Sequence, residues 1–337
     1  MVEEKPARAA NIFDVARLAG VSHQTVSRVL NGLPNVRPAT KERVEQAILQ
    51  LRYSPSPAAR ALVTRRTRTI GLITPGVTDY GPVSIATHFT VAARAERYSV
   101  DTVNTPDADQ VTVRASVEAL LRQRVDAIVL IVADISVLEL VRGLDLGIPI
   151  VASASTPRRS PRLVSIDQYR GARTAVRHLA ELGHERILHI AGPQRASDSA
   201  ERIRGYRDEL AARRLDVLDP IYGDWTAAGG HRLGTSLDIE PGTAIFASND
   251  LTALGLFSAL REKGLRVPDD VSIVGFDDIP EAGYLYPPLT TVRQDFAALG
   301  QMMMHKVLLE LEDPGQGGTS DTPLPTQLVV RDSTRAV

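Results

Sequence analysis

Polar side chains gather behind predicted strands in the second half of the sequence. Arg202, Asn249 and Asp277 each follow closely on a short apolar segment. The carboxyl ends of parallel strands meet at one edge of a sheet, so these side chains are expected to face a common cleft. Carboxylate, amide and guanidinium groups bind neighbouring hydroxyl groups of a ligand through paired hydrogen bonds. The spacing therefore predicts a site for a polyhydroxylated small molecule such as a sugar.

Trp225, the only tryptophan of the chain, and the acidic residues Asp250 and Asp278 are further candidates for this cleft. The face of an indole stacks on the apolar side of a sugar ring, whereas an indole in the core only fills space. Asp250 and Asp278 stand beside Asn249 and Asp277, and capping of a following helix is an equally good interpretation of both. These alternatives stay open for all three residues.

The first 31 residues contain a second set of groups with informative spacing. Apolar residues recur at helical intervals from Ile12 to Ala19, Gly20 permits a tight turn, and Ser22 is a good N-cap for a second helix. The outward face of that helix would carry His23, Gln24, Ser27 and Arg28. Gln pairs with adenine and Arg with guanine in the major groove, and a serine at a helix start holds a phosphate. The run predicts a helix-turn-helix that reads DNA.

The run from Asp14 to Asn31 resembles the head of the lac-repressor family of bacterial transcription regulators. It matches Asp-Val-Ala-x-x-Ala-Gly-Val-Ser-x-x-Thr-Val-Ser-Arg-Val-Leu-Asn at every fixed position, and the resemblance continues to residues 330–334. It implies that bases are read by His23, Gln24 and Arg28. It also implies that backbone phosphates are held by Ser22, Thr25, Ser27 and Asn31. Asn11 departs from the Thr or Ser that commonly starts the first helix, but Asn caps as well.

The segment 57–62 is similar to the hinge helix of that family, in which paired copies from two subunits enter the minor groove. The resemblance implies that Leu62 is wedged between the central base pairs and that the small Ala59 permits close approach. The run has too little apolar surface to be a stable helix alone, so its folding would depend on the correct DNA site. An ordinary linker turn is the alternative.

Beyond residue 66, short apolar segments alternate with helical stretches, which is typical of parallel sheets covered by helices on both faces. Strand candidates centre on Ile70, Val103, Ile128, Ile150, Ile187, Ile221, Ile245 and Ile273, and further extended segments lie at 163–166, 289–292 and 327–330. We therefore predict an all-α helix-turn-helix head with a hinge helix, followed by a two-lobed α/β body of doubly wound parallel sheets, similar to periplasmic binding proteins.

The predicted boundaries follow from these patterns. A DNA-binding domain spans 1–54, and a hinge helix with its linker spans 55–66. The body spans 67–334 and binds the effector and the second subunit. Its N-lobe is about 67–166 and 297–324, and its C-lobe is about 167–293 and 325–334.

The resemblance also assigns effector contacts in the body. It implies contacts from Arg202, Asn249 and Asp277, and in sugar-responsive members also from Ile166, Trp225 and Gln294. The segments 222–226 and 287–296 look most like the lactose-repressor subgroup, so a galactoside is the first expectation. Ser153 and Ala154 stand where the family usually has an Asp, and a nucleoside or another non-sugar ligand is the alternative.

Charge and composition are consistent with a DNA partner and an intracellular location. Residues 1–66 hold 11 Lys and Arg against 5 Asp and Glu, and residues 67–337 hold 28 against 35. A basic head attracts a polyanion because its cations release condensed counterions from phosphates. The chain has no cysteine, which suits a reducing compartment. With neither a signal-peptide pattern nor a long apolar run, we expect a cytoplasmic protein without membrane contact.

Together these features predict a homodimeric repressor of sugar-utilisation genes, which binds a pseudo-palindromic operator and is released by a small sugar. Nucleophile-elbow, phosphate-loop and dinucleotide motifs are missing from the sequence, and His184-Glu-Arg lacks the second histidine of a zinc helix. We therefore expect no enzyme activity, no catalytic residue, no metal site and no cofactor. A sugar-binding transport protein, which would have the lobes but not the head, is the alternative of another class. The sequence leaves open whether the ligand acts as an inducer or as a co-repressor.

Overall fold

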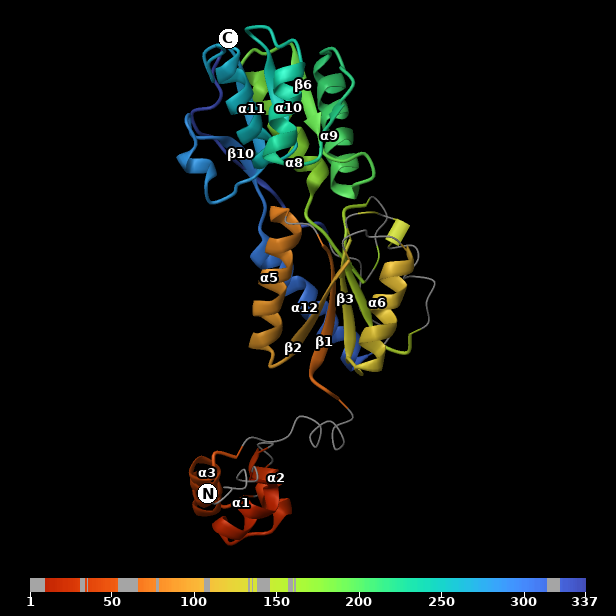
Figure 1. Ribbon diagram of the computed structural model, residues 1–337, viewed down its shortest axis with the longest axis vertical. Helices are drawn as coiled ribbons and strands as arrows, with labels where there is room; N and C mark the ends of the chain where they lie inside the picture. The colour runs from red at the N-terminus through yellow and green to blue at the C-terminus, as the bar shows by residue number, and fades with distance from the viewer. Residues whose placement is uncertain are drawn as a thin grey trace, which may run out of the picture. The chain divides into compact units, whose positions relative to one another are not determined.

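The computed structural model describes most of the chain, and contacts divide it into two compact units, Met1–Thr67 and Arg68–Val337. The described residues are 10–30, 34, 36–53, 66–76, 79–105, 110–132, 134, 136–137, 146–156, 160, 162–313 and 322–337. No helix in these ranges has both the length and the apolar character needed to cross a membrane. Figure 1 shows the elements of each unit.

In the described part of the first unit, three helices pack together: α1 (Ile12–Ala19), α2 (His23–Leu30) and α3 (Pro38–Gln50). Asn11 and Asp14 form a capping box at the start of α1, and Gly20 ends that helix in the left-handed region with φ +65°. Ser22 accepts a hydrogen bond from the Thr25 amide at 3.2 Å and so caps α2, as the sequence predicts.

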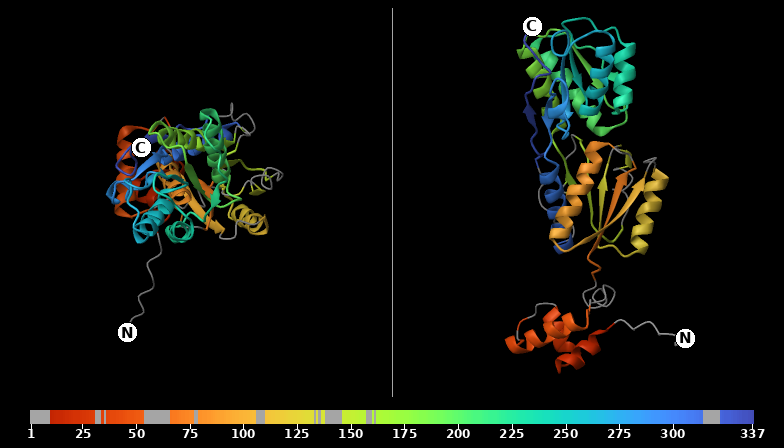
Figure 2. Two further views of the ribbon diagram at one scale, coloured as in Figure 1. Left: turned by 90° about the horizontal axis from the view of Figure 1, so that it is seen from above. Right: turned by 60° about the vertical axis from the view of Figure 1, so that its left-hand side comes forward.

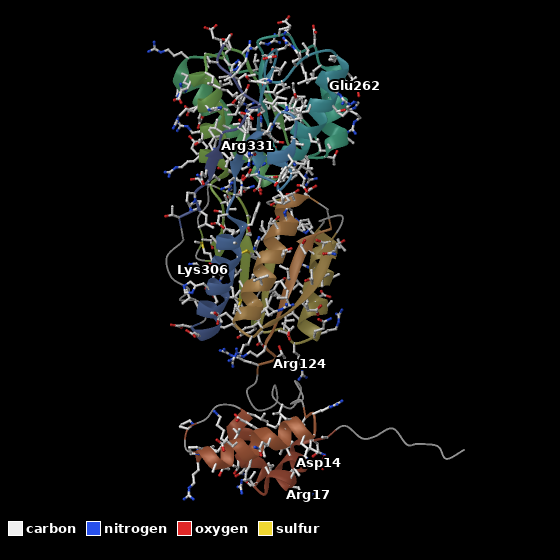
Figure 3. All side chains as sticks on the ribbon, turned by 90° about the vertical axis from the view of Figure 1, so that its left-hand side faces the viewer. Asp14, Arg17, Arg124, Glu262, Lys306 and Arg331 are labelled. Carbon is white, nitrogen blue, oxygen red and sulfur yellow. The ribbon has the colours of Figure 1, made fainter. Side chains whose placement is uncertain are left out.

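A small core holds these three helices together. Its buried members are Val15, Ala16, Ala19, Val26, Val44 and Ala47. Figure 3 marks Asp14 and Arg17 on α1, where Arg17 Nη1 lies 3.8 Å from Asp14 Oδ1. Helices α1 and α2 and the turn at Gly20 match the predicted helix-turn-helix, and α3 packs against both through this core.

The N-lobe of the second unit is built on a fully parallel sheet. Its strands, in spatial order, are β2 (Ser99–Thr105), β1 (Thr69–Pro75), β3 (Ala127–Ile131), β4 (Ile150–Ser153) and β5 (Leu163–Val164). Helices α5 (Tyr80–Ala95) and α12 (Phe296–Glu312) cover one face, and α6 (Gln110–Arg122) covers the other (Figure 1). On β1, Leu72 packs toward α5 and α12 while Ile73 packs toward α6, the alternation expected of a strand buried on both faces.

The C-lobe is a six-stranded sheet with one antiparallel edge. Its strands, in spatial order, are β11 (Gln327–Val329), β10 (Thr290–Arg293), β9 (Ser272–Asp277), β8 (Ala244–Ala247), β6 (Ile187–Ala191) and β7 (Ile221–Tyr222). Only β11 runs antiparallel, against β10. Helices α8 (Gln168–Glu181) and α9 (Ser197–Arg213) pack on one face, and α10 (Ala227–Ser236) and α11 (Asp250–Glu262) on the other. A 3₁₀ turn, η1, spans Ala282–Tyr284.

The chain passes between the lobes near residues 165–167, 294–295 and 322–326, and Figure 2 shows the lobes joined by these segments. Two of the crossings are hydrogen-bonded together: the Leu324 amide donates to the Ser165 carbonyl and the Asp167 amide to the Leu324 carbonyl. The predicted two-lobed α/β body is therefore present. All eight predicted strand centres lie in strands, and the three leftover extended segments supply β5, β10 and β11.

Candidate functional site

A cavity lies where the carboxyl ends of the two sheets face each other. The N-lobe contributes the end of β3, the segment after β4 and the start of α5, and the C-lobe contributes the segments that follow its strands. Six predicted effector contacts line this cavity: Ile166, Arg202, Trp225, Asn249, Asp277 and Gln294. The fold thus brings together residues that are up to 128 positions apart in the sequence.

Arg202 is the centre of a buried polar network in the pocket wall. Its side chain is only 4% exposed, and Nε donates to Gln168 Oε1 at 2.9 Å while Nη1 donates to the Ser248 carbonyl. Nη2 lies 3.7 Å from Asp277 Oδ1, and the guanidinium sits 3.8 Å above the centre of the Phe276 ring. These contacts hold the guanidinium group in one orientation. Its N–H groups that are not used by these contacts can then donate hydrogen bonds to a ligand from fixed positions.

Asp277 faces Arg202 from the end of β9. Gln294 Nε2 donates to Asp277 Oδ1 at 2.6 Å, and Gln294 Oε1 accepts from Gln168 Nε2 at 2.7 Å. Burial raises the pKa of Asp277 to about 7, against the opposing effects of Arg202 and Gln294. Its φ of +111° is a conformation that side chains rarely adopt, and such strain is concentrated at functional sites. The network thus holds a hydrogen-bond acceptor and a hydrogen-bond donor next to each other, an arrangement that fits two adjacent hydroxyl groups of a ligand.

Asn249 and Trp225 line another part of the wall and are joined to each other. Asn249 caps α11 by accepting from the Thr252 amide at 2.9 Å, and its Nδ2 donates to the Trp225 carbonyl at 3.0 Å. The indole lies against Gly192, where a Cβ would overlap its Nε1 edge. That nitrogen is buried without a hydrogen-bond partner among the described residues. Trp225 is half-buried and lines the pocket, so it is not enclosed in the core.

The two further acidic candidates lie outside the pocket lining and have structural partners. Asp250 is fully buried and accepts from the Thr291 hydroxyl at 2.5 Å and from the Ile279 amide at 2.9 Å. Burial, followed by the Asp277 charge, raises its pKa. Asp278 pairs with Arg293 at 2.6 Å and with Arg331, marked in Figure 3, at 2.7 Å. Both residues brace the sheet around the site.

The pocket also contains polar groups that the sequence analysis did not single out. Asp79 and Tyr80 come from the start of α5, Gln168 from the start of α8, and Asp198 from the first turn of α9. Asp79 follows the carboxyl end of β1 in the N-lobe sheet, so the rule used for Asn249 and Asp277 in the C-lobe could have found it. Gln168 and Asp198 lie inside helices, where polar residues are commonplace and carry no such signal.

The histidines of the C-lobe have structural partners. His178 Nε2 lies 2.9 Å from Thr334 Oγ1, His184 Nε2 lies 2.9 Å from Ser272 Oγ, and His231 Nε2 lies 3.0 Å from Glu262 Oε1. Burial lowers the pKa of both His178 and His184. Within the described ranges, no three His, Asp or Glu side chains are placed to share a metal ion.

The second candidate surface is the outward face of α2. His23, Gln24 and Arg28 are exposed there, whereas Val26 on the opposite side is fully buried. Arg28 Nη2 donates to the Pro34 carbonyl at 3.2 Å, and the His23 ring lies 5.1 Å from the ring of Phe13. Thr25 and Ser27 are half-buried beside them. The predicted residues Asn31, Ala59 and Leu62 lie outside the described residues.

Comparison with known proteins gives two family matches. Residues 11–56 match the bacterial regulatory proteins of the lacI family, and residues 176–334 match a periplasmic binding protein-like domain. The chain is 33% identical to the lactose operon repressor of Escherichia coli (strain K12) over 338 residues, which cover 98% of this chain and 92% of that protein.

Solved structures show the same likeness. A lac repressor dimer bound to operator and the anti-inducer ONPF matches with a TM-score of 0.86 and 30% identity, covering 98% of this chain and all of that one. A complex of the transcriptional regulator CelR with cellobiose matches with a TM-score of 0.69 and 30% identity, covering 96% of this chain and 99% of that one.

Proposed function

The chain belongs to the lacI family of bacterial regulatory proteins and is a DNA-binding transcriptional regulator, and we propose that it is a homodimeric repressor released from its operator by a small sugar. Two copies of the three-helix head would bind the two halves of a pseudo-palindromic site. His23, Gln24 and Arg28 would read bases, and Ser22, Thr25, Ser27 and Asn31 would hold phosphates.

The observation that carries the sugar proposal is the polar network around Arg202. Gln168, Arg202, Asp277 and Gln294 present alternating donors and acceptors at one wall, and all four lie in contact with the cavity. A sugar offers adjacent hydroxyls that both donate and accept, and Trp225 supplies an aromatic face for the ring. A nucleobase has fewer hydrogen-bond donors than a sugar, so it would leave more of these polar side chains without a hydrogen bond to the ligand.

Release would work through the two lobes. Ligand contacts come from both of them, so a sugar that binds the closed body more tightly favours closure. The shift would separate the paired hinge segments, in which Leu62 and Ala59 are proposed to contact the minor groove. A coupling free energy of about 1–3 kcal/mol is sufficient to change DNA affinity several-fold.

Two relatives support the sugar class by name. The lactose operon repressor and the CelR–cellobiose complex are both related to this chain over nearly its full length. A galactoside is the first choice because segments 222–226 and 287–296 look like the lactose-repressor subgroup. A transport protein would not need the residues of the head, so that alternative is dropped.

Tryptophan fluorescence tests the effector class directly, because Trp225 is the sole tryptophan and lines the cavity. We would titrate the full chain with galactosides, glucosides, pentoses and nucleosides, and repeat the titration by calorimetry with Trp225→Phe. We expect a saturable change with one sugar class. A response to nucleosides and to none of the sugars would overturn the sugar proposal.

A further inference from the structure

Two carboxylates on opposite lobes line the effector cavity, and neither has a partner among the described residues. Asp79 of the N-lobe precedes α5, and Asp198 of the C-lobe lies in the first turn of α9. Asp79 occupies the N-cap position of its helix, yet its side chain accepts no hydrogen bond from that helix. No hydrogen bond or ion pair to either carboxylate is formed by the described part of the chain. Both acceptors are therefore free for a ligand.

The charges of the cavity lining do not balance. Asp79, Asp198 and Asp277 carry carboxylates, and Arg202 is the only Lys, Arg or His among the described lining residues. The guanidinium of Arg202 is already engaged by Gln168, the Ser248 carbonyl and Asp277. It therefore compensates one carboxylate at most, and the lining has an excess of negative charge.

The electrostatics of the neighbouring groups agree with this excess. Burial, with a further contribution from the charge of Asp224, raises the pKa of Asp79. The charges of Asp198 and Asp79 are among the causes that raise the pKa of Asp277. The nearby Asp250 and Asp278 are held by Thr291, the Ile279 amide, Arg293 and Arg331 and do not line the cavity.

Resting on the function proposed above, we propose that the effector carries a basic nitrogen, as an amino sugar does, and that this nitrogen is held between Asp79 and Asp198. An ammonium group can donate hydrogen bonds to both carboxylates at once and carries a compensating charge, whereas a neutral hydroxyl has one proton to donate and no charge. Trp225 and Tyr80 in the same lining add aromatic surface that is favourable to a cation. Because the two carboxylates belong to different lobes, an ammonium between them would favour closure. A phosphorylated or carboxylated sugar would be repelled.

A set of matched sugars tests this inference with the full chain. Each set has the hydroxyl, amino or acetamido group at the same carbon: galactose, galactosamine and N-acetylgalactosamine, and the corresponding glucose and mannose sets. Dissociation constants would be measured by Trp225 fluorescence and calorimetry at low and high salt. In at least one set we expect the amine to bind roughly tenfold more tightly than both neutral members, a difference of ~1.4 kcal/mol that shrinks with salt.

Two variants test whether the preference for the amine depends on these two carboxylates. Asp79→Asn and Asp198→Asn keep the side-chain shape and should each weaken binding of the amine more than binding of the matched neutral sugars, so that most of the preference for the amine is lost. Asp238→Asn, an exposed residue away from the cavity lining, is the matched control. It should leave the preference intact.

The outcomes separate this inference from the proposed function. Neutral sugars that bind as tightly as the amines in every set would overturn the basic nitrogen and leave a sugar effector in place. An amine preference that survives both Asp variants would also overturn it. If none of these sugars binds while a nucleoside does, the sugar effector itself is wrong, and the amino-sugar inference is wrong with it.

Discussion

Replacing Asp277 by Asn should make the empty protein more stable at alkaline pH while it damages ligand binding. Asp277 is 6% exposed, and burial raises its pKa from 3.8 to about 7. A carboxyl with a raised pKa contributes stability that is complete below pH 3.8 and is lost as the pH rises through about 7. Holding it ionised at pH 8 therefore costs about 4 kcal/mol relative to the unfolded chain, since each pKa unit corresponds to ~1.4 kcal/mol.

The substitution does not recover the whole of that cost. The new amide side chain would keep an acceptor for Gln294, but its NH₂ group would replace the second carboxyl oxygen in a buried position, where a donor without an acceptor costs about 1–3 kcal/mol. We expect Asp277→Asn to gain about 1–3 kcal/mol at pH 8. At pH 5.5 the carboxyl of the original chain is mostly protonated and costs only about 2 kcal/mol, so the gain should be smaller by about 2 kcal/mol.

Urea unfolding followed by Trp225 fluorescence, at pH 5.5 and pH 8, measures both quantities. Calorimetry with the effector should show that the more stable variant binds it at least tenfold more weakly, or ~1.4 kcal/mol. An equal change in the free energy of unfolding at the two pH values would refute the reasoning, because it would mean that Asp277 has an ordinary pKa in the folded protein.

Three further substitutions test other parts of the account. Arg28→Ala should reduce discrimination between a selected operator and random DNA by about 1–3 kcal/mol without changing effector affinity, and an unchanged footprint would contradict base reading by α2. Gly192→Ala should displace the Trp225 indole, because a Cβ at residue 192 would overlap it, and should therefore shift the emission maximum and weaken ligand binding. Gly283→Ala is the control, because a Cβ at that position has space. Glu209→Gln should destabilise the C-lobe by about 1–3 kcal/mol at pH 7. Burial raises the pKa of Glu209, but hydrogen bonds from Arg177, Arg213 and Arg173 outweigh it and lower the pKa to about 2. The loss of unfolding free energy in the variant should therefore be complete above pH 4.5 and should decrease as the pH falls toward 2. Chemical unfolding curves across this pH range measure it.

Much of the fold could be predicted because its sheets are buried on both faces. Such strands are short apolar runs, and all the predicted centres from Ile70 to Ile273 lie in strands. The antiparallel direction of β11 could not be read from its sequence, because direction depends on the crossing at 322–326. The turn after Ala19 was predictable because a left-handed residue there favours glycine.

The site was only partly predictable for a geometric reason. The edge where parallel strands end explains why Arg202, Asn249 and Asp277 come together. The same rule does not separate Asp277 from Asp278, which are adjacent in sequence but face Gln294 and Arg331 respectively. Gln168, which connects Arg202 to Gln294, is recognisable only once the crossing after β5 places α8 beside the cavity.

The central claim is that occupancy of the body controls DNA binding by the head. The direct measurement is the affinity of the full chain for a DNA fragment selected from a random pool, with and without a saturating concentration of the sugar identified by Trp225 fluorescence. We predict that the sugar weakens this binding by at least about fivefold, or ~1 kcal/mol, and that Asp277→Asn removes the response. Unchanged DNA affinity at full sugar occupancy would contradict the account.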